Sequence, residues 1–214
     1  MKRLFTLLTV LFVLFLVGCD TAKQNQHEET ADFTLFSLAW GTDWETAQNS
    51  EFLQNASFDV TENGPRQLVK IEGLDYLGVP LEMTGLAFDI GENAETNGLH
   101  SVFLQFNEEN EATLLGKLTA LYGEPKTAYT DTNGVTIPIQ PIGWVSDDTI
   151  EDVLTAEEKE YYVNLFPADY EQTRLDAALR SPLSSIRFDA ENNLVEFNGN
   201  AAAVVSFIKA ELQK

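Results

Sequence analysis

Residues 82–122 read EMTGLAFDIGENAETNGLHSVFLQFNEENEATLLGKLTALY, and this stretch predicts two strands followed by a helix. The Asn97-Gly98 pair, a strong short-range turn signal, separates the two strands. Apolar residues alternate with other residues on both sides of that turn: Leu86, Phe88 and Ile90 before it, and Val102, Leu104 and Phe106 after it. Alternation gives each strand one buried and one wetter face, which indicates an antiparallel sheet covered on one side.

The helix after these strands is marked at both of its ends. Asn107 is the expected N-cap, and Glu108 and Glu109 place negative charge over the first turn. Its apolar stripe consists of Leu114, Leu115, Leu118, Leu121 and Tyr122. Gly123 ends the helix, and Pro125 prevents its continuation.

Weaker patterns predict elements before this stretch. A short strand runs from Phe33 to residues 39–41, and a helix follows with Thr42 as its N-cap and Glu45 at position N3. Another strand covers residues 66–72. Trp40 and Trp44 are spaced as on one helical face, which fits packed core aromatics better than a binding pair.

Five more elements are predicted after Lys126. The first is an edge strand or an arm over residues 135–140, because Pro138 and Pro141 remove ladder donors. The other four are a helix from the capping box Thr155–Glu158 to about Leu165, a helix over 168–179, a hairpin with strands around 186–188 and 195–197, and a last helix capped by Asn200.

The plan of strand, turn, strand and helix occurs twice, at residues 82–122 and again at 184–213. Phe88-Asp89 and Phe188-Asp189 occupy matching places in the two copies. An internal duplication and a chance recurrence both explain this. We expect an α+β fold with helices on one face of antiparallel sheet, built from a first unit at 33–125 and a second at 126–214 that pack as one globular body.

The N-terminus carries a different kind of signal. Lys2 and Arg3 precede an apolar run, Leu4–Val17, that is 14 residues long. A bilayer-spanning helix needs about 20 apolar residues, whereas the apolar core of a signal peptide needs about 7–15. A transmembrane helix and an ordinary secretory signal are the alternatives to the interpretation that follows.

Leu16-Val17-Gly18-Cys19 resembles the lipobox of bacterial lipoproteins, and Cys19 is the only cysteine in the chain. The resemblance implies that residues 1–18 are a signal peptide, that Cys19 receives a diacylglyceryl thioether and that the Gly18–Cys19 bond is then cut. Residues 19–32 would form the lipidated N-terminus and a polar tether. The protein would then be extracytoplasmic and held at the cell membrane by its lipid.

The net charge of −21 narrows the choice of partners. A surface this acidic repels phosphate backbones, so nucleic acid is not an expected partner. It also repels anionic lipid, so the lipid on Cys19 would have to provide the attachment to the membrane.

The first unit is also similar to known envelope proteins. Trp40-Gly41-Thr42 entering a helix, three antiparallel strands, and a helix ending in Leu121-Tyr122-Gly123-Glu124-Pro125 resemble outer-membrane assembly lipoproteins of the SmpA/OmlA type and the β-lactamase inhibitor protein family. Those families place helices on one face of a sheet and bind other proteins with the remaining surface. They usually begin with two helices, where this chain shows one, and no functional residue is transferred from them.

Signatures of catalysis and of metal binding are missing from the sequence. It has no G-x-S-x-G, H-E-x-x-H, P-loop or G-x-G-x-x-G motif. His100, the only histidine after the tether, is expected to be a partly exposed side chain at the end of the sheet. Asp131-x-Asn133-Gly134 and Asp89–Glu92 lack the ligand ladder of a calcium loop. We therefore predict no catalytic, cofactor-binding or metal-binding residue.

Two classes of function fit these observations. The first is a tethered module that presents a sheet face or loops to another protein or to an envelope polymer. The second is a small-ligand receptor or acid-pair hydrolase that uses tryptophans and carboxylates in a cleft. The missing catalytic signatures favour the first class, and a deep pocket lined by Trp40, Trp144 or paired carboxylates would favour the second.

Overall fold

The computed structural model describes residues 33–90, 98–130, 134–167 and 169–214. The predicted signal peptide, Cys19, the tether, Asn97 and the calcium-loop residues 91–92 and 131–133 lie outside the described residues. Everything described below belongs to one compact unit, Ala31–Lys214. Among its described residues, no helix is long and apolar enough to cross a membrane.

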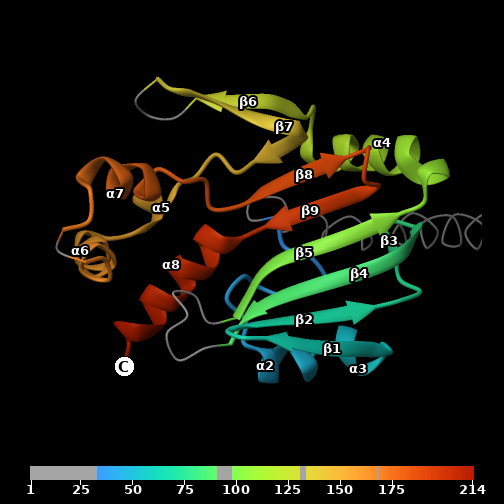
Figure 1. The fold of residues 1–214 in the computed structure, drawn as a ribbon, viewed down its shortest axis with the longest axis horizontal. Helices are drawn as coiled ribbons and strands as arrows, with labels where there is room; N and C mark the ends of the chain where they lie inside the picture. Colours follow the sequence, from blue (N-terminus) through green and yellow to red (C-terminus); the bar gives the residue numbers. More distant parts are fainter. Residues whose placement is uncertain (1–32, 91–97, 131–133, 168) are drawn as a thin grey trace, which may run out of the picture. The chain divides into compact units, whose positions relative to one another are not determined.

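A single antiparallel sheet of nine strands forms the body of this unit (Figure 1). Its strands are β1 Phe58–Asn63, β2 Arg66–Ile71, β3 Asp75–Tyr76, β4 Val79–Asp89, β5 Gly98–Phe106, β6 Lys126–Thr130, β7 Thr136–Val145, β8 Ser185–Asp189 and β9 Leu194–Asn198. Their order across the sheet is β1-β2-β4-β5-β9-β8-β7-β6, and β3 pairs with β4 outside that path.

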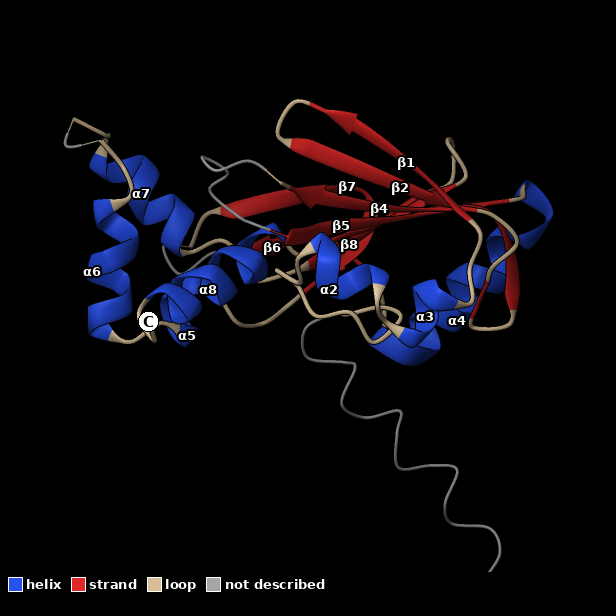
Figure 2. Ribbon diagram, turned by 90° about the horizontal axis from the view of Figure 1, so that it is seen from below, coloured by secondary structure: helices blue, strands red, loops and turns tan. Residues whose placement is uncertain are grey.

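The helices cover only one side of the sheet. They are α2 Trp44–Gln48, α3 Glu51–Gln54, α4 Glu111–Tyr122, α5 Ile150–Val153, α6 Ala156–Asn164, α7 Gln172–Leu179 and α8 Asn200–Glu211, with the short 3-10 helix η1 at Glu108–Asn110. An edge-on view shows α2, α3, α4 and α8 together on one side of the strands (Figure 2). The predicted α+β class is confirmed.

The main core is built from the buried residues that alternate with more exposed ones along the strands. Burial alternates with exposure along the whole of β2, from Arg66 to Ile71. In β4 and β5 the predicted series is buried at Leu86, Phe88, Val102, Leu104 and Phe106. Ile90, which was predicted to belong to this series, is 38% exposed because it lies beyond the end of β4.

The β5–β9 pairing joins the two predicted units within one sheet. Val102 pairs with Leu86 inside the first hairpin, and Phe197 pairs with Ile186 inside the second. Val102 and Phe197 also pair with each other. The two hairpins are therefore related by an approximate two-fold axis through this pair, and α4 and α8 lie toward opposite ends of the sheet (Figure 1).

A second, smaller core lies beyond one end of the sheet. It contains Leu154, Tyr162, Leu175 and other apolar residues of α5–α7 together with Val205 and Ile208 of α8. Helix α8 therefore contributes to both cores, since its Ala203 belongs to the main one.

The predicted strand at the start of the folded part is wrong. Residues 35–38 form a tight turn closed by a hydrogen bond from Leu38 N to Leu35 O, 3.0 Å long. Phe36 and Ser37 both have positive φ, at 57° and 58°. Phe36 stacks on Phe52 with ring centroids 4.2 Å apart, and this contact offsets the cost of a conformation that bulky residues avoid.

Three predicted helix caps are also wrong. Asn107 precedes the 3-10 helix η1 without a side-chain cap hydrogen bond, and Asn110 is the N-cap of α4. The other two caps are wrong by one residue. Asp43, not Thr42, is the N-cap of α2, and its carboxylate accepts from Thr46 N at 2.7 Å. Gly199, not Asn200, is the N-cap of α8. At α2 two neighbouring polar residues could cap the helix equally well, so the sequence pattern did not decide between them. At α8 the N-cap is a glycine, and no side chain caps the helix.

The remaining elements are close to their predictions. The helix 111–122 ends at Gly123, whose φ is 82°, and the capping box of Thr155 and Glu158 is present. The second hairpin is present as β8 and β9, and the helix predicted over 168–179 is shorter, at 172–179. Strands β1, β3 and β6 and helices α3 and α5 were not predicted.

Candidate functional site

The sheet face opposite the helices is the first candidate surface (Figure 2). One continuous cross-strand row runs along it through paired residues of all eight strands on the main path. The row is Asp59, Lys70, Gly85, Phe103, Glu196, Arg187, Gly143 and Lys126. In the central strands β2, β4, β5, β9 and β8 the residues before and after these are buried in the core, so the row stands on the open side.

Phe103 forms an apolar centre in this row. Its ring lies over Gly85 of the neighbouring strand, and Leu68 of β2 packs beside the same glycine. Leu68 is 44% exposed. We call Leu68, Phe103, Arg187 and Glu196, with Gly85 beneath them, the open-face patch.

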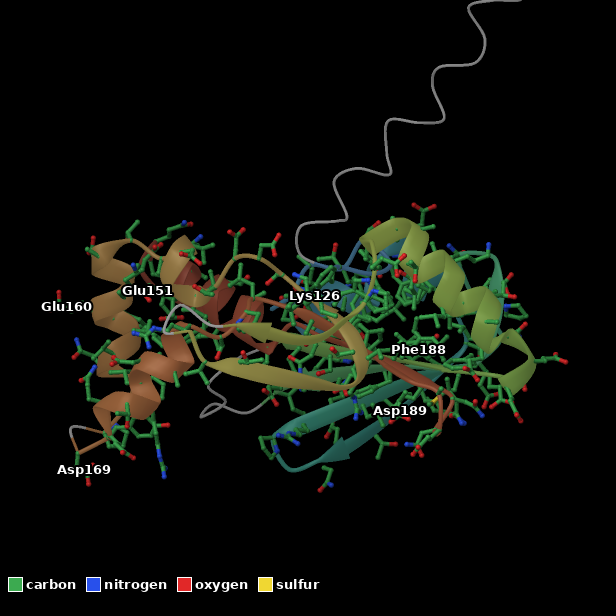
Figure 3. The ribbon with its side chains drawn as sticks, turned by 90° about the horizontal axis from the view of Figure 1, so that it is seen from above. Lys126, Glu151, Glu160, Asp169, Phe188 and Asp189 are labelled. Carbon is green, nitrogen blue, oxygen red and sulfur yellow. The ribbon has the colours of Figure 1, made fainter. Side chains whose placement is uncertain are left out.

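Charged residues border the apolar centre of the open-face patch. Arg187 Nε lies 3.0 Å and Nη2 2.9 Å from Glu196 Oε2, and Arg187 Nη1 lies 3.9 Å from Asp189 Oδ2. Figure 3 labels Phe188, which belongs to the buried core, and Asp189, the next residue along β8. The Arg187 side chain is 42% exposed, so part of it is accessible to a partner.

His100 lies at the end of the same face, in an irregular part of the β4–β5 pairing. Its Nδ1 is 3.0 Å from Ser101 Oγ, and its Nε2 is 3.7 Å from Asp89 Oδ1. The side chain is 15% exposed, so it is more buried than the sequence predicted. Burial lowers the pKa of His100, and Arg66 adds to this effect while Asp89 and Glu196 oppose it.

This cluster contains the residue types of a Ser-His-Asp triad, but its geometry suits structure better than nucleophilic attack. Ser101 is only 3% exposed, so its hydroxyl offers a substrate almost no access. A nucleophile has to reach the reacting carbon as well as its base. We assign no catalytic role to the three residues.

Trp40 has two roles. Its indole ring packs on the backbone of Gly199, and it is 4% exposed within the main core. It also lines a pocket of about 290 Å³ between the main core and the α5–α8 core. We call this space the junction pocket. Its presence gives the small-ligand hypothesis an observation that the sequence alone did not provide.

The other two tryptophans are structural. Trp44 makes edge-on contacts with Phe58 and Phe88, at centroid distances of 5.7 Å and 5.4 Å. Trp144 is 3% exposed and donates through its indole Nε1 to Gly123 O at 2.7 Å. The expectation that Trp40 and Trp44 are packed core aromatics is thus confirmed.

Carboxylates are numerous among the described residues. Glu151, Glu160 and Asp169 lie apart on the α5–α7 region (Figure 3). In the part of the chain that the structure describes, no group of three or more His, Cys, Asp and Glu side chains could hold a metal ion.

Sequence reasoning missed most of these surface residues. Leu68 and Phe103 occupy outward positions in strands, and an apolar residue at an outward position is the available signal. Arg187 and Glu196 become partners only when β8 and β9 are placed in register. Lys209 lies in the last turn of α8, and its place in the junction pocket depends on contacts between distant segments.

Comparisons with protein-family models, with curated proteins and with solved structures gave no match for this chain.

Proposed function

We propose that this protein is a lipid-anchored, extracytoplasmic binding module that docks another protein on its open-face patch. The lipobox supports the anchor and the location. The observation that supports the docking site most directly is Phe103, an aromatic side chain lying on Gly85 on the side of the sheet that no described helix covers.

The composition of the patch favours a protein over a polymer. An aromatic ring and an aliphatic side chain form its centre, and a partly exposed arginine stands beside them. Aromatic residues and arginine dominate binding energy at protein interfaces, with polar groups at the rim. The two charges of the patch, on Arg187 and Glu196, are paired with each other, so the acidic excess of the chain does not repel a partner there.

The place where the described chain begins is compatible with this arrangement. Phe33 is buried, and its ring contacts Tyr122 at the end of α4 edge-on, at 5.1 Å. The chain thus enters the unit on the helical side of the sheet. A tether that reaches this point from the membrane would leave the open-face patch accessible.

Docking is tested by comparing two leucines of equal exposure. Leu68 lies in the patch and is 44% exposed, whereas Leu165 follows α6 and is 46% exposed. Leu68→Ser should remove the protein from its complex in gently solubilised membranes, as seen by native electrophoresis. Leu165→Ser should leave the complex intact. Equal migration of both variants with the wild-type complex would contradict the proposal.

The anchor is tested separately. Cys19→Ala should abolish incorporation of a labelled lipid precursor and leave an uncut precursor. Label retained by that variant would end the lipoprotein interpretation, because Cys19 provides the only thiol in the chain.

A second function, reception of a small ligand, is favoured by one observation. The junction pocket is lined by Trp40 and lies where two cores meet, which is a frequent place for ligand sites.

A further inference from the structure

The junction pocket is built from three distant parts of the chain. Trp40 comes from the segment before α2. Val153 is the last residue of α5, and Leu183 follows α7. Val205 and Lys209 come from α8. Trp40, Leu183 and Val205 are between 4% and 7% exposed. Apolar walls from both cores therefore face the pocket together with the polar side chains of Thr34, Ser206, Asp148 and Lys209.

The pocket has the size of a small organic molecule. Its volume of about 290 Å³ corresponds to about ten waters at about 30 Å³ each. A ligand that filled it would touch α8 and residues from both cores at the same time.

Lys209 gives the pocket its chemical preference. The side chain is half-buried, and no carboxylate of the described residues lies within 4.0 Å of its ammonium group. The pKa of Glu158 is lowered chiefly by the hydrogen bond from the Thr155 amide, with a small contribution from Lys209. Lys209 therefore has a carboxylate in its surroundings, but no carboxylate of the described residues forms an ion pair with it.

The remaining charge in the lining is Asp148, which is exposed. Its carboxylate would repel a second negative charge on a ligand. Lys209 and Asp148 together therefore favour a ligand with a single negative charge and an apolar body.

We propose that the junction pocket binds a small amphipathic monoanion, such as a short-chain carboxylate. Its anionic group pairs with Lys209 Nζ, and its apolar body packs against Trp40 and Val205. This inference rests on the second function above, the small-ligand receptor, and is independent of docking at the open-face patch.

The test uses the full lipidated chain in lipid nanodiscs, with hexanoate as the probe. Hexanol and hexylammonium serve as neutral and cationic probes with the same alkyl chain. Hexanoate should raise the melting temperature in a saturable way, because a ligand that binds only the folded state stabilises it. It should also change the fluorescence of Trp40, measured in a Trp44→Phe, Trp144→Phe background.

Three variants distinguish binding of hexanoate in the junction pocket from an effect of the protein's net charge. Lys209→Met should weaken hexanoate binding at least tenfold, and Asp148→Asn should strengthen it. Lys159→Met, which makes the same charge change in α6, should leave binding unaltered. The melting assay in the wild-type tryptophan background covers the case in which the tryptophan variants fold poorly.

Three results would overturn the inference. They are a non-saturable response to hexanoate, equal responses to the three probes, and equal loss of binding in the Lys209 and Lys159 variants. Docking by the open-face patch would survive any of them, because its test depends on Leu68 and not on the pocket.

Discussion

The indole ring of Trp40 lies so close to the backbone of Gly199 that a Cβ atom at position 199 would overlap it. The contact joins the segment before α2 to the N-terminus of α8. It therefore fixes the position of the helix that shares in both cores and in the junction pocket.

Gly199→Ala should lower the free energy of unfolding by about 1–3 kcal/mol, because an added methyl in a packed site forces shifts. Gly116 is the matched control, since it lies on an exposed part of α4 with open space around it. Gly116→Ala should stabilise the protein by about 0.5–1 kcal/mol through helix propensity. Urea denaturation of both variants measures the two effects. A stabilised Gly199 variant would show that the Trp40 contact is misplaced.

Leu118 and Phe103 test which side of the sheet is covered. Leu118 is a fully buried residue of α4, so Leu118→Ala should lower the free energy of unfolding by about 2–5 kcal/mol. Phe103 is half-buried on the open side, and Phe103→Ala should cost less. Chemical denaturation gives both values. A larger loss at Phe103 would mean that a second layer covers the open-face patch.

Asp43 tests the corrected N-cap of α2. Asp43→Ala should cost about 0.5–2 kcal/mol, and Asp43→Asn should cost much less, because asparagine also caps helices well. The pKa of Asp43 is lowered mainly by the hydrogen bond from Thr46 N. Its contribution is therefore present above the unfolded-state pKa and is lost as the pH falls through the folded-state pKa. Thermal melts from neutral pH to pH 3 should show a smaller pH dependence for Asp43→Asn than for wild type.

His100 should produce a second pH dependence at higher pH. Burial lowers its pKa in the folded state, so the unfolded chain takes up a proton first as the pH falls. Stability should therefore decline as the pH falls from about 6.5, the unfolded-state value, toward the folded-state value. In His100→Gln this decline should be absent. A variant that retains the full decline between pH 7 and pH 5 would place its origin at another group.

Local patterns in the sequence were sufficient to predict the helices and strands that bury one face. The alternation around Leu86 and Val102, the stripe around Leu118 and the hairpin at 185–198 each contain their own evidence. Strand β1 carried no such evidence, because as an edge strand it is exposed at five of its six positions. A strand with little burial has no hydrophobic period to detect.

The other features of the fold and of the candidate sites depend on pairing between strands that are far apart in the sequence, so local patterns could not predict them. The β5–β9 seam joins Val102 to Phe197, and nothing near either residue specifies the other. The row of the open-face patch and the junction pocket both depend on such contacts. Phe103 could be recognised only as an outward-facing aromatic, and Lys209 only as a basic residue near a helix end.

Photo-cross-linking at the open-face patch tests the central claim most directly. Benzoylphenylalanine is placed at Leu68 in one variant and at Leu165 in another, and cells carrying each full-length variant are irradiated. A discrete adduct with one protein from position 68, and none from position 165, is the predicted result. The same adducts from both positions, or an adduct from position 165 alone, would contradict docking by the open face of the sheet.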